Sequence, residues 1–267
     1  MSVQTQIDRL NKAKSDLKTS ITNKGVAVSD DALISDYPAL VDSIQTGGGD
    51  NVFDASLGGK LAYSTFETLP YNIINTSQVT DMSDFFSNNG SLTFLDLSNF
   101  DTSNATDMSG MFFNINPFGS LSLDLSNFNT SKVKKMNNMF ASCSGLRSLD
   151  LSSFDTSQVT NMSNMFSFCS RLRSLDLSNF NTSHTKDMYW MFAYSSSLET
   201  LDLSSFDTSQ VTNMSNMFNS CGSLTTVKVI NCNDATKQKI LTQLQTDITT
   251  KTWTLGDDGI ITGVAKS

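Results

Sequence analysis

The chain has 267 residues, of which 38% are apolar and 16% are charged, so it is large enough for a soluble repeat domain with additional segments. Its formal net charge of −8 argues against a nucleic-acid partner, because phosphate groups repel an acidic surface. No apolar run reaches the ~18 residues of a membrane-spanning helix, and the first residues lack the pattern of a secretion signal.

The first 46 residues are predicted to be helical. Apolar residues recur in steps of four and three over residues 3–22, and a second helix is predicted over residues 31–45. Two interpretations are open: the first helix forms a short coiled coil, or it packs as an amphipathic helix on the second. In either case we expect residues 1–46 to attach or oligomerise the protein. The glycines of residues 47–52 predict a flexible linker, since no Gly-Lys-Ser/Thr follows them.

Residues 69–226 repeat one sequence six times. The repeats are spaced by 26 residues except for one interval of 28, and they begin at Leu69, Leu95, Leu123, Leu149, Leu175 and Leu201. A fixed period of this length is typical of a solenoid, in which each unit buries its apolar face only against its neighbours. We therefore predict an α/β fold: a leucine-rich-repeat-like, right-handed solenoid of six coils with parallel strands. Residues 53–68 are expected to cap its first coil.

Each coil is predicted to run from a strand through a turn into a short helix. Leu149 and Leu151 alternate with Asp150, so both leucines are expected to point inward. A polar turn follows at residues 155–157, and then Met162, Met165 and Phe166 have the spacing of one helical face.

The recurring methionines and cysteines are interpreted as core residues. Eleven of the twelve methionines occupy repeated positions, which favours core packing over a methionine-rich binding groove. Cys143, Cys169 and Cys221 share one position, where the intervening coil has Ser195. We expect buried free thiols, with a Cys143–Cys169 disulfide as the alternative. No histidine or cysteine spacing indicates a metal site.

The pattern changes after Thr226, and residues 227–267 are predicted to form a C-terminal cap. Residues 234–247 have the spacing of an amphipathic helix, and residues 252–255 and 260–264 flank a hairpin turn at Asp257-Asp258-Gly259. A cap is expected because an open end of the solenoid would expose core and strand edge.

One coil departs from the repeat by gaining aromatic residues. Trp190 stands where other coils have Gly or Asn, so it is expected to be substantially exposed, and Phe168 and Tyr194 share a position on adjacent coils. Aromatic groups beside polar ones on a rigid surface suit glycan or protein binding, while local packing or an oligomer interface is the alternative. The hypothesised binding residues are Phe168, His184, Lys186, Tyr189, Trp190 and Tyr194.

A row of carboxylates on the strand face is the second binding candidate, consisting of Asp96, Asp124, Asp150, Asp176 and Asp202. Such a row could accept sugar hydroxyls or divalent cations, or serve only to keep the strand face soluble. Lys132, Lys134 and Lys135 recur in register as His184, Lys186 and Asp187. These residues could form a basic stripe for anionic surface polymers, but ordinary solvated charge is the favoured interpretation. The single histidine has no matching nucleophile or base, so we expect no catalysis and no cofactor.

The repeat, Leu-Asp-Leu-Ser-x-Phe-Asp/Asn-Thr-Ser-x-Val-Thr-x-Met-Ser-x-Met-Phe, closely resembles that of BspA-like bacterial surface proteins and mycoplasma lipoproteins. The resemblance covers residues 69–226. It implies a leucine-rich-repeat-like solenoid with an extracellular binding or adhesive role and no enzymatic activity.

Residues 10–44 resemble the opening segment of phage tail-fibre and minor structural proteins. A virion part needs no secretion signal, and so this resemblance favours a non-enzymatic phage structural protein, associated with a tail or fibre, that binds a host-surface glycan or protein. Its expected partners are other virion proteins through residues 1–46 and further copies of itself. Its expected location is the virion, without membrane insertion. The alternatives are a BspA-like adhesin on a bacterial cell surface and a phage head fibre or decoration protein.

Overall fold

The structure is a computed structural model that describes residues 76–77, 79–90, 95, 97–98, 100–115 and 122–266. The chain divides into two compact units, and every described residue belongs to the second of them. The predicted helical segment (1–46), the linker (47–52), the N-terminal cap (53–68) and Leu69 lie outside the described residues.

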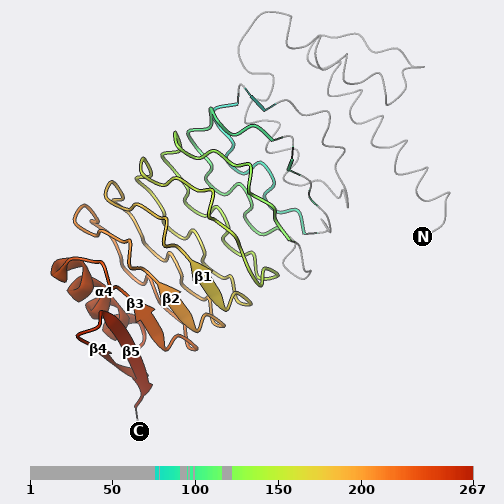
Figure 1. The fold of residues 1–267 in the computed structure, drawn as a ribbon. Helices are drawn as coiled ribbons and strands as arrows, with labels where there is room; N and C mark the ends of the chain where they lie inside the picture. Colours follow the sequence, from blue (N-terminus) through green and yellow to red (C-terminus); the bar gives the residue numbers. More distant parts are fainter. Residues whose placement is uncertain are drawn as a thin grey trace, which may run out of the picture. The chain divides into compact units, whose positions relative to one another are not determined.

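Successive repeats lie side by side, in parallel and in register with the sequence period (Figure 1). Strands β1 (Ser174–Asp176), β2 (Thr200–Asp202) and β3 (Thr226–Lys228) pair in parallel. Isolated parallel bridges join one position of six successive repeats, namely Asp81, Asp107, Lys135, Asn161, Asp187 and Asn213. The right-handed solenoid of six whole coils stays a prediction, because the first coil opens at Leu69.

Among the described residues, parallel strands occur only near the C-terminal end of the stack. The leucine segments at residues 123–125 and 149–151 are not strands, and Leu149 is half-buried, whereas Leu151 is 2% exposed. The sequence predicted strands at both segments and two inward leucines. Strand β3 also pairs with residues 260–262 of the C-terminal hairpin. The parallel ladder of strands extends from β3 back to β1.

The predicted short helix is replaced by consecutive turns. The N–H of Met165 donates to Met162 O at 3.2 Å and that of Ser167 to Asn164 O at 3.0 Å, while the alternate amides donate to the next coil. The N–H of Asn164, for example, donates to Tyr189 O at 2.8 Å. The helix prediction is wrong because Asn164 and Phe168 have φ angles of 58° and 59°, which stop a right-handed helix. Methionine and phenylalanine at helical spacing also fit this chain of turns.

The core prediction is confirmed for the described methionines. All eleven are buried, with at most 5% exposure. Beside them, the phenylalanines that end the turn segments form a column of stacked rings with centroids 5.5–5.9 Å apart: Phe112, Phe140, Phe166, Phe192 and Phe218. Each ring therefore packs on its equivalents in the neighbouring coils, as expected when a unit buries its apolar face by stacking.

A column of buried threonines links the coils at one corner. Thr156 is 0% exposed, and its hydroxyl donates to Asn181 O at 3.1 Å while accepting from Asn181 N–H at 2.8 Å. Thr102, Thr130 and Thr182 make the same two bonds to the next coil, with donated bonds of 2.9–3.1 Å and accepted bonds of 2.8 Å. Here a side chain satisfies the main-chain groups that a strand ladder satisfies elsewhere.

The described cysteines are free and buried. The thiols of Cys143, Cys169 and Cys221 donate to a phenylalanine carbonyl of the preceding coil at 3.0–3.2 Å, and the Ser195 hydroxyl does the same at 2.7 Å. This shared bond explains why serine and cysteine interchange at this position. Burial raises the pKa of the Cys169 and Cys221 thiols to about 12, so they stay protonated donors at neutral pH.

A helix and a hairpin close the C-terminal end of the stack (Figure 1). Helix α4 spans Asp234–Asp247, strand β4 Lys251–Leu255 and strand β5 Ile260–Ala265. The strand order is β1-β2-β3-β5-β4, with β5 antiparallel to both neighbours. The sequence placed the helix and both hairpin strands at these positions within one residue. No helix in the described part of the chain is long and apolar enough to cross a membrane.

Side chains of helix α4 take the place of a further coil. The Asp247 carboxylate accepts from Phe218 N–H at 2.9 Å, a role that main-chain carbonyls have in earlier coils. The Thr236 hydroxyl accepts from Thr208 N–H, and Lys239 Nζ donates to Val211 O at 2.6 Å. Burial raises the pKa of Asp247, against the opposing effect of its bonds from Phe218 and Gln243.

At pH 7, replacing Asp247 with asparagine is expected to increase the free energy of unfolding by between zero and about 1 kcal/mol. The gain is small because solvent screens the charge of this partly exposed carboxylate. Because the pKa of Asp247 is raised in the folded state, the protonated carboxyl group stabilises the fold. This contribution is lost as pH rises through the folded-state pKa. The asparagine amide keeps an acceptor for Phe218 N–H without a charge. Urea unfolding between pH 7 and the ordinary aspartate pKa of about 3.9 checks this. We expect any advantage of D247N to shrink as pH falls, and an advantage that grows would contradict the assignment.

Candidate aromatic binding site

Four aromatic side chains of the predicted binding residues lie together on the turn segments of two adjacent coils. The rings of Phe168 and Tyr194 stack with centroids 4.5 Å apart and an angle of 2° between their planes. The Trp190 ring lies 5.4 Å from that of Tyr194 and 6.3 Å from that of Phe168, tilted by about 50° to both. Tyr189 stacks on Trp190 at 5.5 Å. We call these four residues the aromatic patch.

Three residues of the aromatic patch occupy positions that require a left-handed backbone. Two such positions occur in the turn segment of each coil, four residues apart, and Phe168, Trp190 and Tyr194 have φ angles of 59°, 56° and 61°. In other coils these positions carry Asp84, Asn88, Gly110, Asn114, Asn138, Ser142, Asn164, Asn216 and Ser220. Large aromatic residues are rare in this conformation, which costs about 1–2 kcal/mol for a residue other than glycine. The fold does not require aromatic side chains here.

Trp190 is half-buried, and the prediction that it is substantially exposed is wrong. Tyr189, Phe168 and Tyr194 crowd its ring, and its indole Nε1 is buried without a hydrogen-bond partner among the described residues. Comparison with equivalent positions could not show this, because the neighbours that cover Trp190 are themselves exceptions to the repeat. The exposed members are Phe168 and Tyr194, which are 42% and 37% exposed.

His184 and Lys186 are exposed, but no described contact joins either side chain to the aromatic patch. His184 Nδ1 lies 3.4 Å from the Ser183 hydroxyl, and Lys186 contributes its main-chain carbonyl to Thr212 of the next coil. Both residues of the predicted polar rim lie on the segment that precedes the turns.

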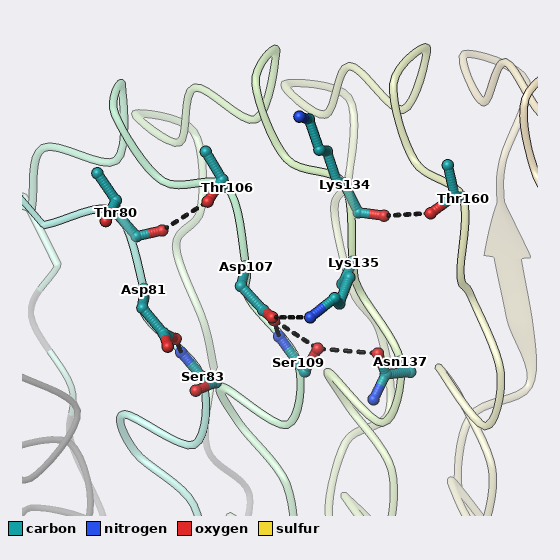
Figure 2. A network of polar contacts seen from close by, with 10 residues as sticks. All are labelled: Thr80, Asp81, Ser83, Thr106, Asp107, Ser109, Lys134, Lys135, Asn137 and Thr160. Atoms are coloured by element: carbon teal, nitrogen blue, oxygen red, sulfur yellow. Dashed lines mark hydrogen bonds and ion pairs between the residues drawn. The ribbon is translucent and has the colours of Figure 1, made fainter.

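The surface that carries Lys186 is a polar network between coils, shown for earlier repeats in Figure 2. Threonine hydroxyls there donate to carbonyls of the preceding coil, as Thr160 does to Lys134 O at 3.1 Å. Lys135 Nζ lies 2.8 Å from Asp107 Oδ2. Burial opposes ionisation of Asp107, but hydrogen bonds from Lys135 and Ser109 outweigh it and keep the pKa below its usual value.

Two of the five basic residues in the proposed stripe, Lys132 and Lys135, have side-chain partners within the protein. Lys135 pairs with Asp107, and Lys132 Nζ donates to Asn104 Oδ1 at 2.7 Å, which leaves Lys134 exposed between them. The Asp107–Lys135 ion pair was missed by the sequence reasoning. Its signal was present, because Lys135 replaces aspartate or asparagine at a repeated position beside Asp107.

The carboxylates of the aspartate row are occupied in local turns. Asp124, Asp150 and Asp176 each accept through Oδ1 from the N–H two residues later, at 2.9–3.0 Å. These bonds from Ser126, Ser152 and Ser178 keep the pKa values of the three carboxyls below the usual range. Asp202 lies 3.6 Å from Lys228, and Asp96 is outside the described residues. No group of residues suited to holding a metal ion occurs in the described ranges.

The described residues form a stack of sequence repeats that is closed by a helix and a hairpin, which defines the chain as a repeat protein. Sequence comparison agrees with the repeat: the family described as Mycoplasma protein of unknown function, DUF285, matches residues 61–167 and 143–249. Together these matches span well over half of the chain, so the chain belongs to this family. The match supports the resemblance to BspA-like repeats.

No curated protein and no solved structure matches the chain. The family match begins at residue 61, and the resemblance of residues 10–44 to phage structural proteins receives no support from these comparisons.

Proposed function

We propose that this protein is a non-enzymatic surface-binding protein of the adhesin type, in which a six-coil solenoid presents the aromatic patch to a partner. The observation that carries the proposal is the left-handed backbone at Phe168, Trp190 and Tyr194. The equivalent positions of other coils carry small or amide residues. The fold therefore forms without aromatic residues at these positions, and it does not explain the backbone strain at the three aromatic residues. Strain of this kind concentrates at functional sites.

The other candidate surfaces support binding less well. Three carboxylates of the aspartate row each accept a hydrogen bond within a turn, and Lys132 and Lys135 of the basic stripe have partners within the protein. By contrast, Phe168 and Tyr194 present exposed apolar groups on a rigid stack of coils, and aromatic anchors on rigid elements dominate binding energy in interaction modules.

The test is attachment of the labelled full chain to a panel of bacterial and animal cells. A triple variant that restores repeat residues, Phe168→Ser with Trp190→Asn and Tyr194→Ser, is expected to bind at least about 30-fold more weakly than the wild type. The matched control Val264→Thr alters an exposed apolar residue in the cap and should bind normally. Equal binding by the wild type and the folded triple variant would remove the aromatic patch as the site.

The second candidate is a phage virion component, which the resemblance of residues 10–44 favours. In that case the solenoid would bind a host surface and residues 1–46 would attach to other virion proteins. Mass spectrometry of purified virions would detect the protein there, whereas antibody labelling of intact, phage-free cells would place it on the cell surface. The patch variants apply equally to both placements.

A further inference from the structure

Each ring of the stacked pair in the aromatic patch has a second face that the other ring leaves free, and Phe168 and Tyr194 are 42% and 37% exposed. Phe168 and Tyr194 belong to adjacent coils, and with parallel rings at 4.5 Å each covers one face of the other. The other face of Phe168 is turned toward the coil with Ser142 at the same position, and that of Tyr194 toward the coil with Ser220. A serine side chain is too short to cover a six-membered ring.

The last coil, which adjoins Tyr194, carries polar side chains beside this ring. Ser220 is exposed, and its hydroxyl donates to Asn219 Oδ1 at 2.9 Å. The main-chain N–H groups of the turn segments donate toward the following coil, as Trp190 N–H does to Ser215 O, so the equivalent groups of the last coil are directed away from Tyr194.

We propose that the aromatic patch binds a saccharide, with a pyranose ring stacked on the free face of Tyr194 beside Ser220. This inference rests on the proposed binding function and assigns its ligand class. A pyranose has an apolar face of C–H groups that packs on an aromatic ring, and its rim carries oxygens that accept hydrogen bonds. The ring face of Tyr194 provides the apolar contact, and the polar side chains of Asn219 and Ser220 on the adjoining last coil provide groups that can bond to the rim.

The size of the apolar surface favours a saccharide over a protein partner. Among the described residues, the exposed large apolar side chains are Phe168, Tyr194, Ile230 and Val264. Only Phe168 and Tyr194 contact each other, and small polar residues flank them at the repeated positions. A stable protein interface buries about 800 Å² on each partner around an apolar centre, which two side chains do not supply. A second copy is further disfavoured by the net charge of −8 on each chain.

The test uses an array of neutral and acidic oligosaccharides, from mono- to hexasaccharides of common hexoses and N-acetylhexosamines, with the full chain as probe. The wild type is expected to bind a subset, and Tyr194→Ser should weaken that binding about 30-fold or more. Serine occupies this position with the same backbone at Ser142 and Ser220, so Y194S is expected to fold. Unfolding in urea confirms folding, and Ile230→Ser is the matched control that should leave binding unchanged.

Treated cells separate this inference from the proposed function. Periodate destroys the vicinal diols of surface saccharides, and protease removes surface proteins. Binding that is lost after periodate and survives protease supports a saccharide ligand. Binding that survives periodate and is lost after protease overturns the saccharide assignment but leaves the binding function in place. The same conclusion follows if the protein binds cells but binds no saccharide on the array. Saccharide binding that is equal in wild type and Y194S places the site elsewhere, and a wild type that binds no cells overturns the proposed function itself.

Discussion

Replacing Thr156 with valine is expected to destabilise the protein by roughly 1–3 kcal/mol, because two part-buried main-chain groups of Asn181 lose their partner at once. The Thr156 hydroxyl accepts from Asn181 N–H and donates to Asn181 O, and the side chain is fully buried. Valine has nearly the same shape, so the change removes the hydrogen bonds without opening a large cavity. The free energy of unfolding in urea measures the effect.

Thr212→Val is the matched control for this prediction. Thr212 is exposed, and its hydroxyl donates to Lys186 O, which also accepts from the N–H groups of Thr212 and Asn213. That carbonyl keeps its partners when the hydroxyl is removed, and an exposed substitution of this kind changes stability by about 0.5 kcal/mol or less. Equal losses for the two variants would show that the threonine column does not join the coils in the way described.

The recurrence of residue types was a reliable guide to the core. A methionine or phenylalanine that returns in every coil meets its own equivalents, so burial at one position implies burial at all of them. The same reasoning placed Cys143 and Cys169 inside and grouped Phe168 with Tyr194. Recurrence also located the change of pattern after Thr226, where helix α4 and the hairpin follow.

Local conformation was harder to read from the same pattern. The spacing of Met162, Met165 and Phe166 suits a helix, yet consecutive turns produce it equally well. The signal for turns was the recurrence of asparagine, glycine and serine four residues apart, as at Asn138 and Ser142, since these residues tolerate a left-handed backbone. Likewise, a serine two residues after Asp150 indicated a turn that would engage its carboxylate.

The position of Trp190 could not be predicted because its burial depends on other exceptions to the repeat. Comparison with Asn164 and Asn216 correctly identified a position at the surface. It gave no information on Tyr189 and Phe168, whose rings cover the indole. Residues that break a repeat must be interpreted together, since each changes the surroundings of the others.

Replacing Trp190 with asparagine is expected to weaken attachment about 30-fold or more while changing stability by no more than about 1 kcal/mol. Asparagine is the residue at this position in the neighbouring coils, where Asn164 and Asn216 both have a φ of 58°. The gain from relieving strain at a φ of 56° offsets the loss of ring contacts with Tyr189 and Tyr194. Cell attachment and urea unfolding measure the two effects separately.

Trp190→Ala separates backbone strain from ring packing in the same experiment. Alanine loses the ring contacts as asparagine does, but it tolerates the left-handed backbone less well, so W190A should be less stable than W190N by about 0.5–1 kcal/mol. Both variants should attach equally weakly, because neither has the indole. Attachment by W190N at the wild-type level would show that the indole does not contribute to binding. A W190A protein as stable as W190N would show that the left-handed backbone at this position carries no strain. Strain at Trp190 would then not indicate a functional site.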